Sequence, residues 1–166
     1  AMQYMLKETD DEAVKRSIRQ DQLFGIESQG YMFTIATTNM ILRGDGKSNL
    51  HNWDFLAQNP AQLQLNACTV GMMNPPYSQA QKTKDSKQYE INFTEHLLDS
   101  LVKGAKCIVI IPQSSLTGKT LAEKNIKYNI LKHHTLEGVI TLQKDTFYSV
   151  GTNPCIAVFT AGIPHD

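Results

Sequence analysis

Four consecutive residues, Asn74-Pro75-Pro76-Tyr77, combine groups that could hold and orient an amine. Proline fixes its own φ and pushes the preceding residue toward extended geometry, so Asn74 and Pro75 are expected to be rigid. The side-chain carbonyl of Asn74 and the backbone carbonyl of Pro75 can accept both hydrogens of an exocyclic amino group. These contacts would draw the nitrogen lone pair out of conjugation and let it attack an activated methyl group. Tyr77 can stack on the planar base that carries the amine.

The alternative for this tetrad is a strand that simply ends in a proline-rich turn. The uncharged run from Ala67 to Met73 leads into the tetrad and is typical of a strand buried in a parallel sheet. Open α/β sheets bind their ligands at the carboxyl ends of the strands. The position of the tetrad therefore favours a function over a structural turn.

The charge balance argues against a protein that holds a nucleic acid through an overall basic excess. The chain has 166 residues, with 16 basic and 16 acidic side chains and no net charge. Proteins that hold a phosphate backbone alone usually carry a basic excess. Any DNA or RNA partner is therefore expected to be held largely by other domains or subunits, or by a local patch.

The spacing of cysteine and histidine indicates neither disulfides nor a metal site. Cys68, Cys107 and Cys155 are far apart, and no pair has CxxC spacing. Free thiols in a reducing cytoplasm are therefore expected. The histidines are isolated or directly adjacent, which suits zinc poorly. No apolar run approaches the roughly 20 residues that span a bilayer, so we expect no membrane partner.

Short apolar runs alternate with helical patterns along the chain. The final two strands are joined by too few residues for a helix, so they should be antiparallel neighbours. This order predicts an α/β fold with a doubly wound, mostly parallel Rossmann-like sheet and an antiparallel final strand, with residues 1–166 in a single domain. The expected strands are residues 22–27, 67–73, 106–112, 136–142 and 153–160, the expected helices are 31–42, 89–102 and 119–134, and 43–49 is expected to be a loop.

The tetrad is the catalytic motif of the amino methyltransferases that use S-adenosylmethionine, and the chain resembles that family. Residues 35–49, IATTNMILRGDGKSN, look like the modification (M) subunits of type I restriction–modification systems, which methylate adenine N6 in DNA. The resemblance runs from Gln22 to about Thr160. It implies the sheet of the S-adenosylmethionine-dependent methyltransferases, an adenine-specific DNA methyltransferase activity, and three partners: DNA, a specificity subunit and a restriction subunit.

The resemblance also assigns roles to individual residues. Glu27 would accept from the ribose hydroxyls of the cofactor, and the alternative is a solvated glutamate at a strand end. Asp54 would accept from the cofactor's adenine amino group with Phe55 beside the ring, and the alternative is a helix N-cap. The implied catalytic residues are Asn74, Pro75, Pro76 and Tyr77; the base-binding residues are Tyr77 and Phe147, although core packing explains Phe147 almost equally well; the cofactor-binding residues are Glu27, Asp54, Phe55 and Asn74.

One feature of the family is absent from this sequence. The family's glycine-rich cofactor turn follows a first strand, whereas the residues before Gln22 look like a helix. We therefore expect the chain to be the larger C-terminal part of a catalytic domain, with the first strand upstream and with weak or absent binding of S-adenosylmethionine. Two alternatives stay open: a methyltransferase acting on protein glutamine or RNA bases, and an inactive truncated domain that only packs against partners.

Overall fold

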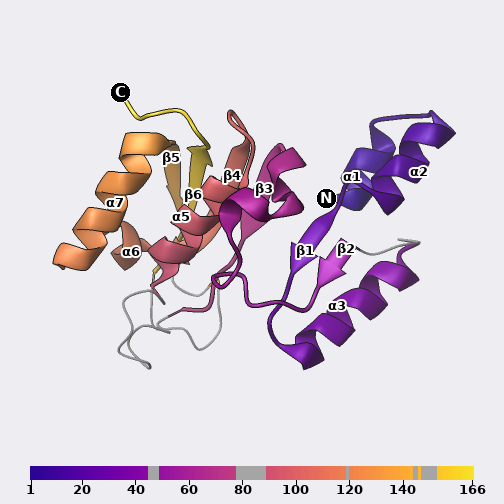
Figure 1. Cartoon of the computed structure of the whole chain (residues 1–166), viewed down its shortest axis with the longest axis horizontal. Helices are drawn as coiled ribbons and strands as arrows, with labels where there is room; N and C mark the ends of the chain where they lie inside the picture. Colours follow the sequence, from indigo (N-terminus) through magenta and orange to yellow (C-terminus); the bar gives the residue numbers. More distant parts are fainter. Residues whose placement is uncertain (45–48, 78–88, 119, 144–145, 147–152) are drawn as a thin grey trace. The chain divides into compact units, whose positions relative to one another are not determined.

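The computed structural model of the chain describes residues 1–44, 49–77, 89–118, 120–143, 146 and 153–166 (Figure 1). These residues form two compact units, Ala1–Asn59 and Pro60–Asp166.

The described part of the first unit contains three helices and a two-stranded sheet. The two strands are parallel, and their register runs from Phe24 opposite Asn49 to Ile26 opposite His51. The elements are α1 (Met2–Lys7), α2 (Glu12–Gln20), β1 (Phe24–Ile26), α3 (Gly30–Leu42) and β2 (Asn49–His51).

The expected strand and helix at β1 and α3 are confirmed, but the expected loop over residues 43–49 is wrong at its end. Asn49 opens β2, and its side-chain amide donates to the carbonyl oxygen of Gln20 at 2.9 Å. A strand of three residues, two of them polar, is too short to show a periodic pattern. The strand β2 is instead stabilised by its pairing with β1. Residues 45–48 of the expected loop lie outside the described residues.

The second unit contains a four-stranded sheet, and helices connect several of its strands along the chain. The expected strands and helices are confirmed within a few residues. The exception is Ala67, which belongs to a 3₁₀ turn before β3; the short helix α6 was not predicted. The elements are η1 (Pro60–Gln62), η2 (Gln64–Ala67), β3 (Val70–Met73), α5 (Glu90–Ser100), β4 (Lys106–Pro112), α6 (Gln113–Thr117), α7 (Leu121–His133), β5 (Thr135–Thr141) and β6 (Pro154–Thr160).

The strand order of this sheet is β3-β4-β6-β5. Strand β3 is parallel to β4, and β6 lies between β4 and β5, antiparallel to both. Strands β3, β4 and β5 therefore point the same way, and only the last strand is reversed. The prediction of an α/β fold whose final strand is antiparallel and adjacent to the preceding one is confirmed.

The core of the second unit lies on one face of this sheet. Cys107, Val109 and Ile111 alternate along β4, and each is completely buried. Helices α5 and α7 contact each other and cover this face (Figure 1). Gly71 allows α5 and the residue that follows it to approach β3, because an added Cβ would lie 2.6 Å from the Cδ1 atom of Leu101.

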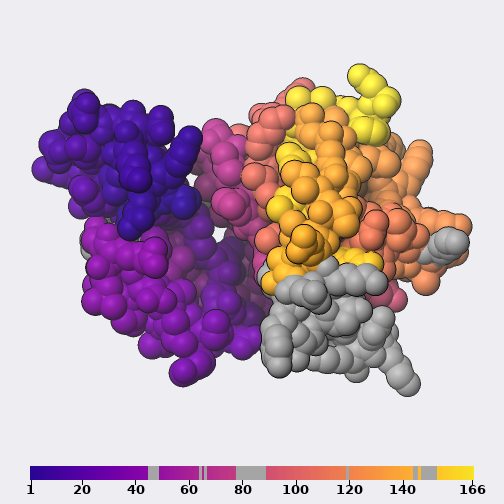
Figure 2. Space-filling model, turned by 180° about the vertical axis from the view of Figure 1, so that it is seen from behind, coloured from indigo at the N-terminus to yellow at the C-terminus, as the bar shows by residue number. Residues whose placement is uncertain are grey.

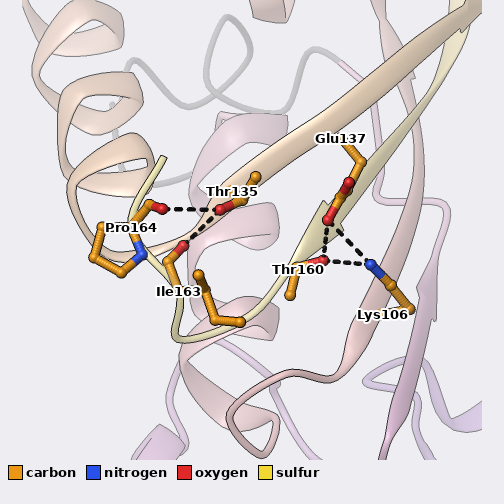
Figure 3. A network of polar contacts seen from close by, with 6 residues as sticks. All are labelled: Lys106, Thr135, Glu137, Thr160, Ile163 and Pro164. Atoms are coloured by element: carbon orange, nitrogen blue, oxygen red, sulfur yellow. Dashed lines mark hydrogen bonds and ion pairs between the residues drawn. The ribbon is translucent and has the colours of Figure 1, made fainter. Parts of the chain in front are cut away.

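A polar network closes one end of the sheet (Figure 3). The Lys106 ammonium lies 3.0 Å from a carboxylate oxygen of Glu137 and donates to the Thr160 hydroxyl at 2.7 Å. That hydroxyl in turn donates to the same Glu137 oxygen. Glu137 lies at a bulge in β5, between Leu136 and Gly138, and this irregularity turns its side chain toward the other two strands.

Candidate active site

The tetrad follows directly on the carboxyl end of β3. Burial alternates through this segment without a break at the end of the strand: Gly71 is buried, Met72 exposed, Asn74 exposed and Pro75 buried. The extended geometry that Pro75 imposes on Asn74 continues the alternation of the strand. The amide of Asn74 thus projects outward while the proline behind it packs into the unit.

Three other chain segments meet this edge of the sheet. Strand β4 is parallel to β3 and also ends here, and α6 begins immediately afterwards at Gln113. Strand β6 starts at the same edge, where the Gln113 N–H donates to the carbonyl oxygen of Asn153 at 2.8 Å. The N–H of Leu142, after β5, donates to the carbonyl oxygen of Pro154 at 3.0 Å. The tetrad therefore lies at the edge where α/β sheets place their ligands.

Tyr77 is partly buried and is held by a hydrogen bond to the neighbouring strand β4. Its hydroxyl donates to the carbonyl oxygen of Ile110 over 3.5 Å, a long hydrogen bond. The pKa of Tyr77 lies above its usual value, mainly because burial disfavours the phenolate, with smaller contributions from the negative forms of Cys155 and Glu90. Tyr77 is therefore neutral at neutral pH. It offers a ring face and a hydroxyl rather than a base.

The first unit places Glu27 at the carboxyl end of β1. One carboxylate oxygen accepts from the Gln29 N–H at 2.8 Å, and the Glu27 N–H donates to the carbonyl oxygen of His51 at 3.0 Å. The Asn52 side-chain amide donates to the Glu27 carbonyl oxygen at 2.7 Å. These contacts hold a half-buried carboxylate at the strand end. Such a group fits the vicinal hydroxyls of a ribose.

Asp54 lies in a turn two residues beyond Asn52. One of its carboxylate oxygens accepts from the Leu56 N–H at 3.1 Å, and its backbone carbonyl accepts from the Gln58 side chain at 3.1 Å. Asp54 therefore stabilises its own turn through its side chain. The next regular element is the 3₁₀ helix η1, so no α-helix starts at Asp54 as the N-cap alternative required. Phe55, the next residue, is half-buried.

An aromatic row beside Asp54 was missed by the sequence reasoning. The rings of His51 and Trp53 stack with centroids 4.1 Å apart, and the ring centroid of Phe24 lies 5.0 Å from that of His51. Trp53 remains exposed. The only signal in the sequence was two rings spaced two residues apart at the end of a very short strand.

The predicted site residues divide between the two units, and the predicted cofactor-binding residues are found in both. Asn74, Pro75, Pro76 and Tyr77 belong to the second unit, whereas Glu27, Asp54 and Phe55 belong to the first. Phe147, the second predicted base-binding residue, lies outside the described residues. In the described segments, no helix is long and apolar enough to cross a membrane, and no three His, Cys, Asp or Glu side chains cluster as metal ligands.

Known proteins resemble this chain over nearly all of its length. A curated relative, "Type II restriction enzyme and methyltransferase RM.BcgI" of Heyndrickxia coagulans, is 48% identical over 165 residues. These cover 99% of this chain but only 26% of the relative.

Solved structures share the fold at low sequence identity. The type I restriction enzyme EcoKI M protein matches with a TM-score of 0.83 and 16% identity, over 98% of this chain and 37% of the other. A modification subunit of a putative type I restriction enzyme from Vibrio vulnificus matches with a TM-score of 0.81 and 15% identity, over 100% and 38%. The sequence profile of the N-6 DNA methylases matches residues 2–165. The chain belongs to the N-6 DNA methylase family.

Proposed function

We propose that the full-length protein transfers a methyl group from S-adenosylmethionine to adenine N6 in DNA, as part of a restriction–modification system. The observation that carries this proposal is the place of the tetrad, directly after β3 at the ligand-binding edge of the sheet. Membership of the N-6 DNA methylase family and a relative named as a restriction enzyme and methyltransferase support the same reaction.

Asn74 and Pro75 would hold the amine. The exposed Asn74 side chain and the backbone carbonyl of Pro75 each accept one hydrogen of the adenine amino group, which concentrates the lone pair on nitrogen. Tyr77 supplies the face on which the base stacks. The adenine must leave the duplex to reach these groups, because its amino nitrogen is not accessible in the stack.

S-adenosylmethionine, when bound, supplies the activated methyl group that the amine attacks. Among the described residues, Glu27 fits the ribose best, because its carboxylate is already held at a strand end by the Gln29 N–H. One carboxylate oxygen of Asp54 accepts a hydrogen bond from the Leu56 N–H within its turn. Its role toward an adenine amino group, with Phe55 beside the ring, remains part of the proposal.

We infer further that this chain alone binds S-adenosylmethionine weakly or not at all, because its sequence lacks a glycine-rich turn after a first strand. We also propose that its two compact units are parts of one catalytic domain, since the family profile runs through both without interruption. DNA recognition would fall to a specificity subunit and cleavage to a restriction subunit in the cytoplasm. The absence of a net positive charge is consistent with that division.

The test uses the full-length gene product with radiolabelled S-adenosylmethionine and unmethylated duplex DNA, RNA and protein as separate acceptors. Incorporation into DNA as N6-methyladenine is expected. Asn74→Ala should abolish it while cofactor binding, measured by titration calorimetry, stays near the unaltered value. Asn125→Ala, at an exposed asparagine on α7, is the matched control. Near-normal turnover by Asn74→Ala would overturn the proposal, as would methylation of RNA or protein alone.

A further inference from the structure

Asn52 is the first residue after β2, and its side chain contacts the two residues that follow the neighbouring strand β1. Its side-chain amide nitrogen donates to the carbonyl oxygen of Glu27 at 2.7 Å and to that of Ser28 at 3.1 Å. The amide nitrogen has two hydrogens, so these two acceptors occupy both of them. Every residue concerned belongs to the first unit, which is coloured from indigo to purple in the space-filling view (Figure 2).

The amide of Asn52 continues the pairing of β1 with β2 where the backbone ladder ends. The paired residues end at Ile26 and His51, and the Glu27 N–H still donates to the carbonyl oxygen of His51 at 3.0 Å. In a continuing parallel ladder, the Glu27 carbonyl would accept from the backbone N–H two residues beyond His51. The side chain of Asn52 donates to that carbonyl. The backbone after Asn52 can therefore leave the sheet and form the turn of Asp54.

The second acceptor of Asn52 belongs to the peptide group that holds the Glu27 carboxylate. The Ser28 carbonyl and the Gln29 N–H are the two polar ends of one planar peptide unit. Asn52 binds the carbonyl end, and the N–H end donates to a carboxylate oxygen of Glu27 at 2.8 Å. Asn52 therefore orients this N–H. A hydrogen bond accepted at the oxygen also polarises the peptide and strengthens the bond that its N–H donates.

We propose that Asn52 is a positioning residue for the ribose of the cofactor and acts through Glu27. The inference rests on the proposed function, in which the Glu27 carboxylate accepts from the ribose hydroxyls. A carboxylate offers about four acceptor positions, and the Gln29 N–H uses one, so the others stay available to the ribose. Asn52 keeps them in one direction, because it holds the Glu27 backbone at its carbonyl and orients the N–H that binds the carboxylate.

This arrangement predicts an effect on ribose recognition and not only on stability. Loss of the Asn52 amide should weaken the binding of a ligand whose hydroxyls Glu27 accepts from, and should affect an analogue that lacks such a hydroxyl much less. A bond that merely stabilised the end of the two-stranded sheet would change the binding of both ligands alike. The ratio of the two affinities therefore separates a positioning residue from a structural one.

Asn49 is a matched control at the other end of the same strand. Its side-chain amide also donates to a backbone carbonyl oxygen, that of Gln20, at 2.9 Å. Asn49→Ala therefore removes the same kind of hydrogen bond from β2 without changing any contact of Glu27.

The experiment measures the binding of S-adenosylhomocysteine and of its 2′-deoxy analogue to the full-length gene product by titration calorimetry. The readout is the preference for the ribose ligand, given by the ratio of the two dissociation constants. Glu27→Gln should reduce this preference. Asn52→Ala should reduce it by about 2- to 10-fold, the range expected for the loss of one hydrogen bond, while Asn49→Ala leaves it unchanged. In a Glu27→Gln background, Asn52→Ala should cause no further loss, because the two residues act as one unit.

The outcomes distinguish this inference from the proposed function. An unchanged preference in Asn52→Ala, where Glu27→Gln loses it, would overturn the positioning role and leave the role of Glu27 intact. Equal weakening of both ligands, or a similar loss of preference in Asn49→Ala, would make Asn52 a structural residue. An unchanged preference in Glu27→Gln would refute the ribose contact itself, and the inference with it. Asn52→Ser removes the amide with a residue that turns accept readily, so it replaces Asn52→Ala if that variant does not fold.

Discussion

The hydroxyl and the ring of Tyr77 predict different costs for its two simplest replacements. Tyr77→Phe removes the hydroxyl and keeps the ring, whereas Tyr77→Ala removes both. The hydroxyl makes a long hydrogen bond of 3.5 Å to the Ile110 carbonyl oxygen at a partly buried position. A bond of that length belongs at the lower end of the usual net contribution of about 0.5–1.5 kcal/mol. That bond holds the ring and does not touch the reacting atoms, so Tyr77→Phe should lower kcat/KM by no more than about twofold.

The ring should matter far more, because stacking of a base on an aromatic side chain contributes about 1–3 kcal/mol. At about 1.4 kcal/mol for each factor of ten, Tyr77→Ala should lower kcat/KM by about 5- to 150-fold. The ratio between the two variants therefore tests whether the face of Tyr77 or its hydroxyl carries the function.

The assay is methyl transfer to unmethylated plasmid DNA by the full-length gene product, with kcat and KM determined separately. Tyr128→Phe, at an exposed tyrosine on α7, controls for any general effect of losing a hydroxyl. If Tyr77→Phe falls as far as Tyr77→Ala, the hydroxyl takes part in the chemistry and the stacking role is refuted.

Three further predictions concern the fold and its titratable groups. Phe159→Ala empties a site that is 2% exposed and should lower the free energy of unfolding by about 3–5 kcal/mol in urea titrations; a loss within error would contradict its place in the core. The pKa of Glu137 is lowered by the Thr160 hydroxyl and then by Lys106. The contribution of Glu137 to folding stability is therefore present above the ordinary value of 4.5 and is lost as the pH falls below that value toward the lower folded-state pKa. Glu137→Gln should show a weaker acid dependence of Tm, and an unchanged dependence would argue against the network. Burial raises the pKa of Cys107 to about 12, so this thiol should resist alkylation at mildly alkaline pH until the protein unfolds. Mass spectrometry of the alkylated peptide measures this labelling. Rapid labelling of the folded protein would exclude the buried position.

The elements that could be predicted from the sequence are those whose own residues determine them. The run from Lys106 to Pro112 is short, rich in β-branched residues and ended by a proline, which together favour a buried strand, and β4 spans those residues. Helix α7 begins where Thr120 and Glu123 form a reciprocal cap, a pattern readable in the sequence. By contrast, β2 depends on its pairing with β1. The insertion of β6 between β4 and β5 depends on contacts between distant segments, which a local pattern does not encode.

The candidate site divides in the same way. The place of Asn74 directly after a strand could be predicted, because prolines that follow an apolar run mark the end of that strand. The expected burial of that strand is wrong, since Gly71 is buried but Val70 and Met72 are exposed. The turn around Asp54 and the stack of His51 on Trp53 could not, since both depend on how β2 ends. The rigid backbone at Pro75 and Pro76 could be recognised in the sequence, whereas the surroundings of each side chain depend on the pairing of strands.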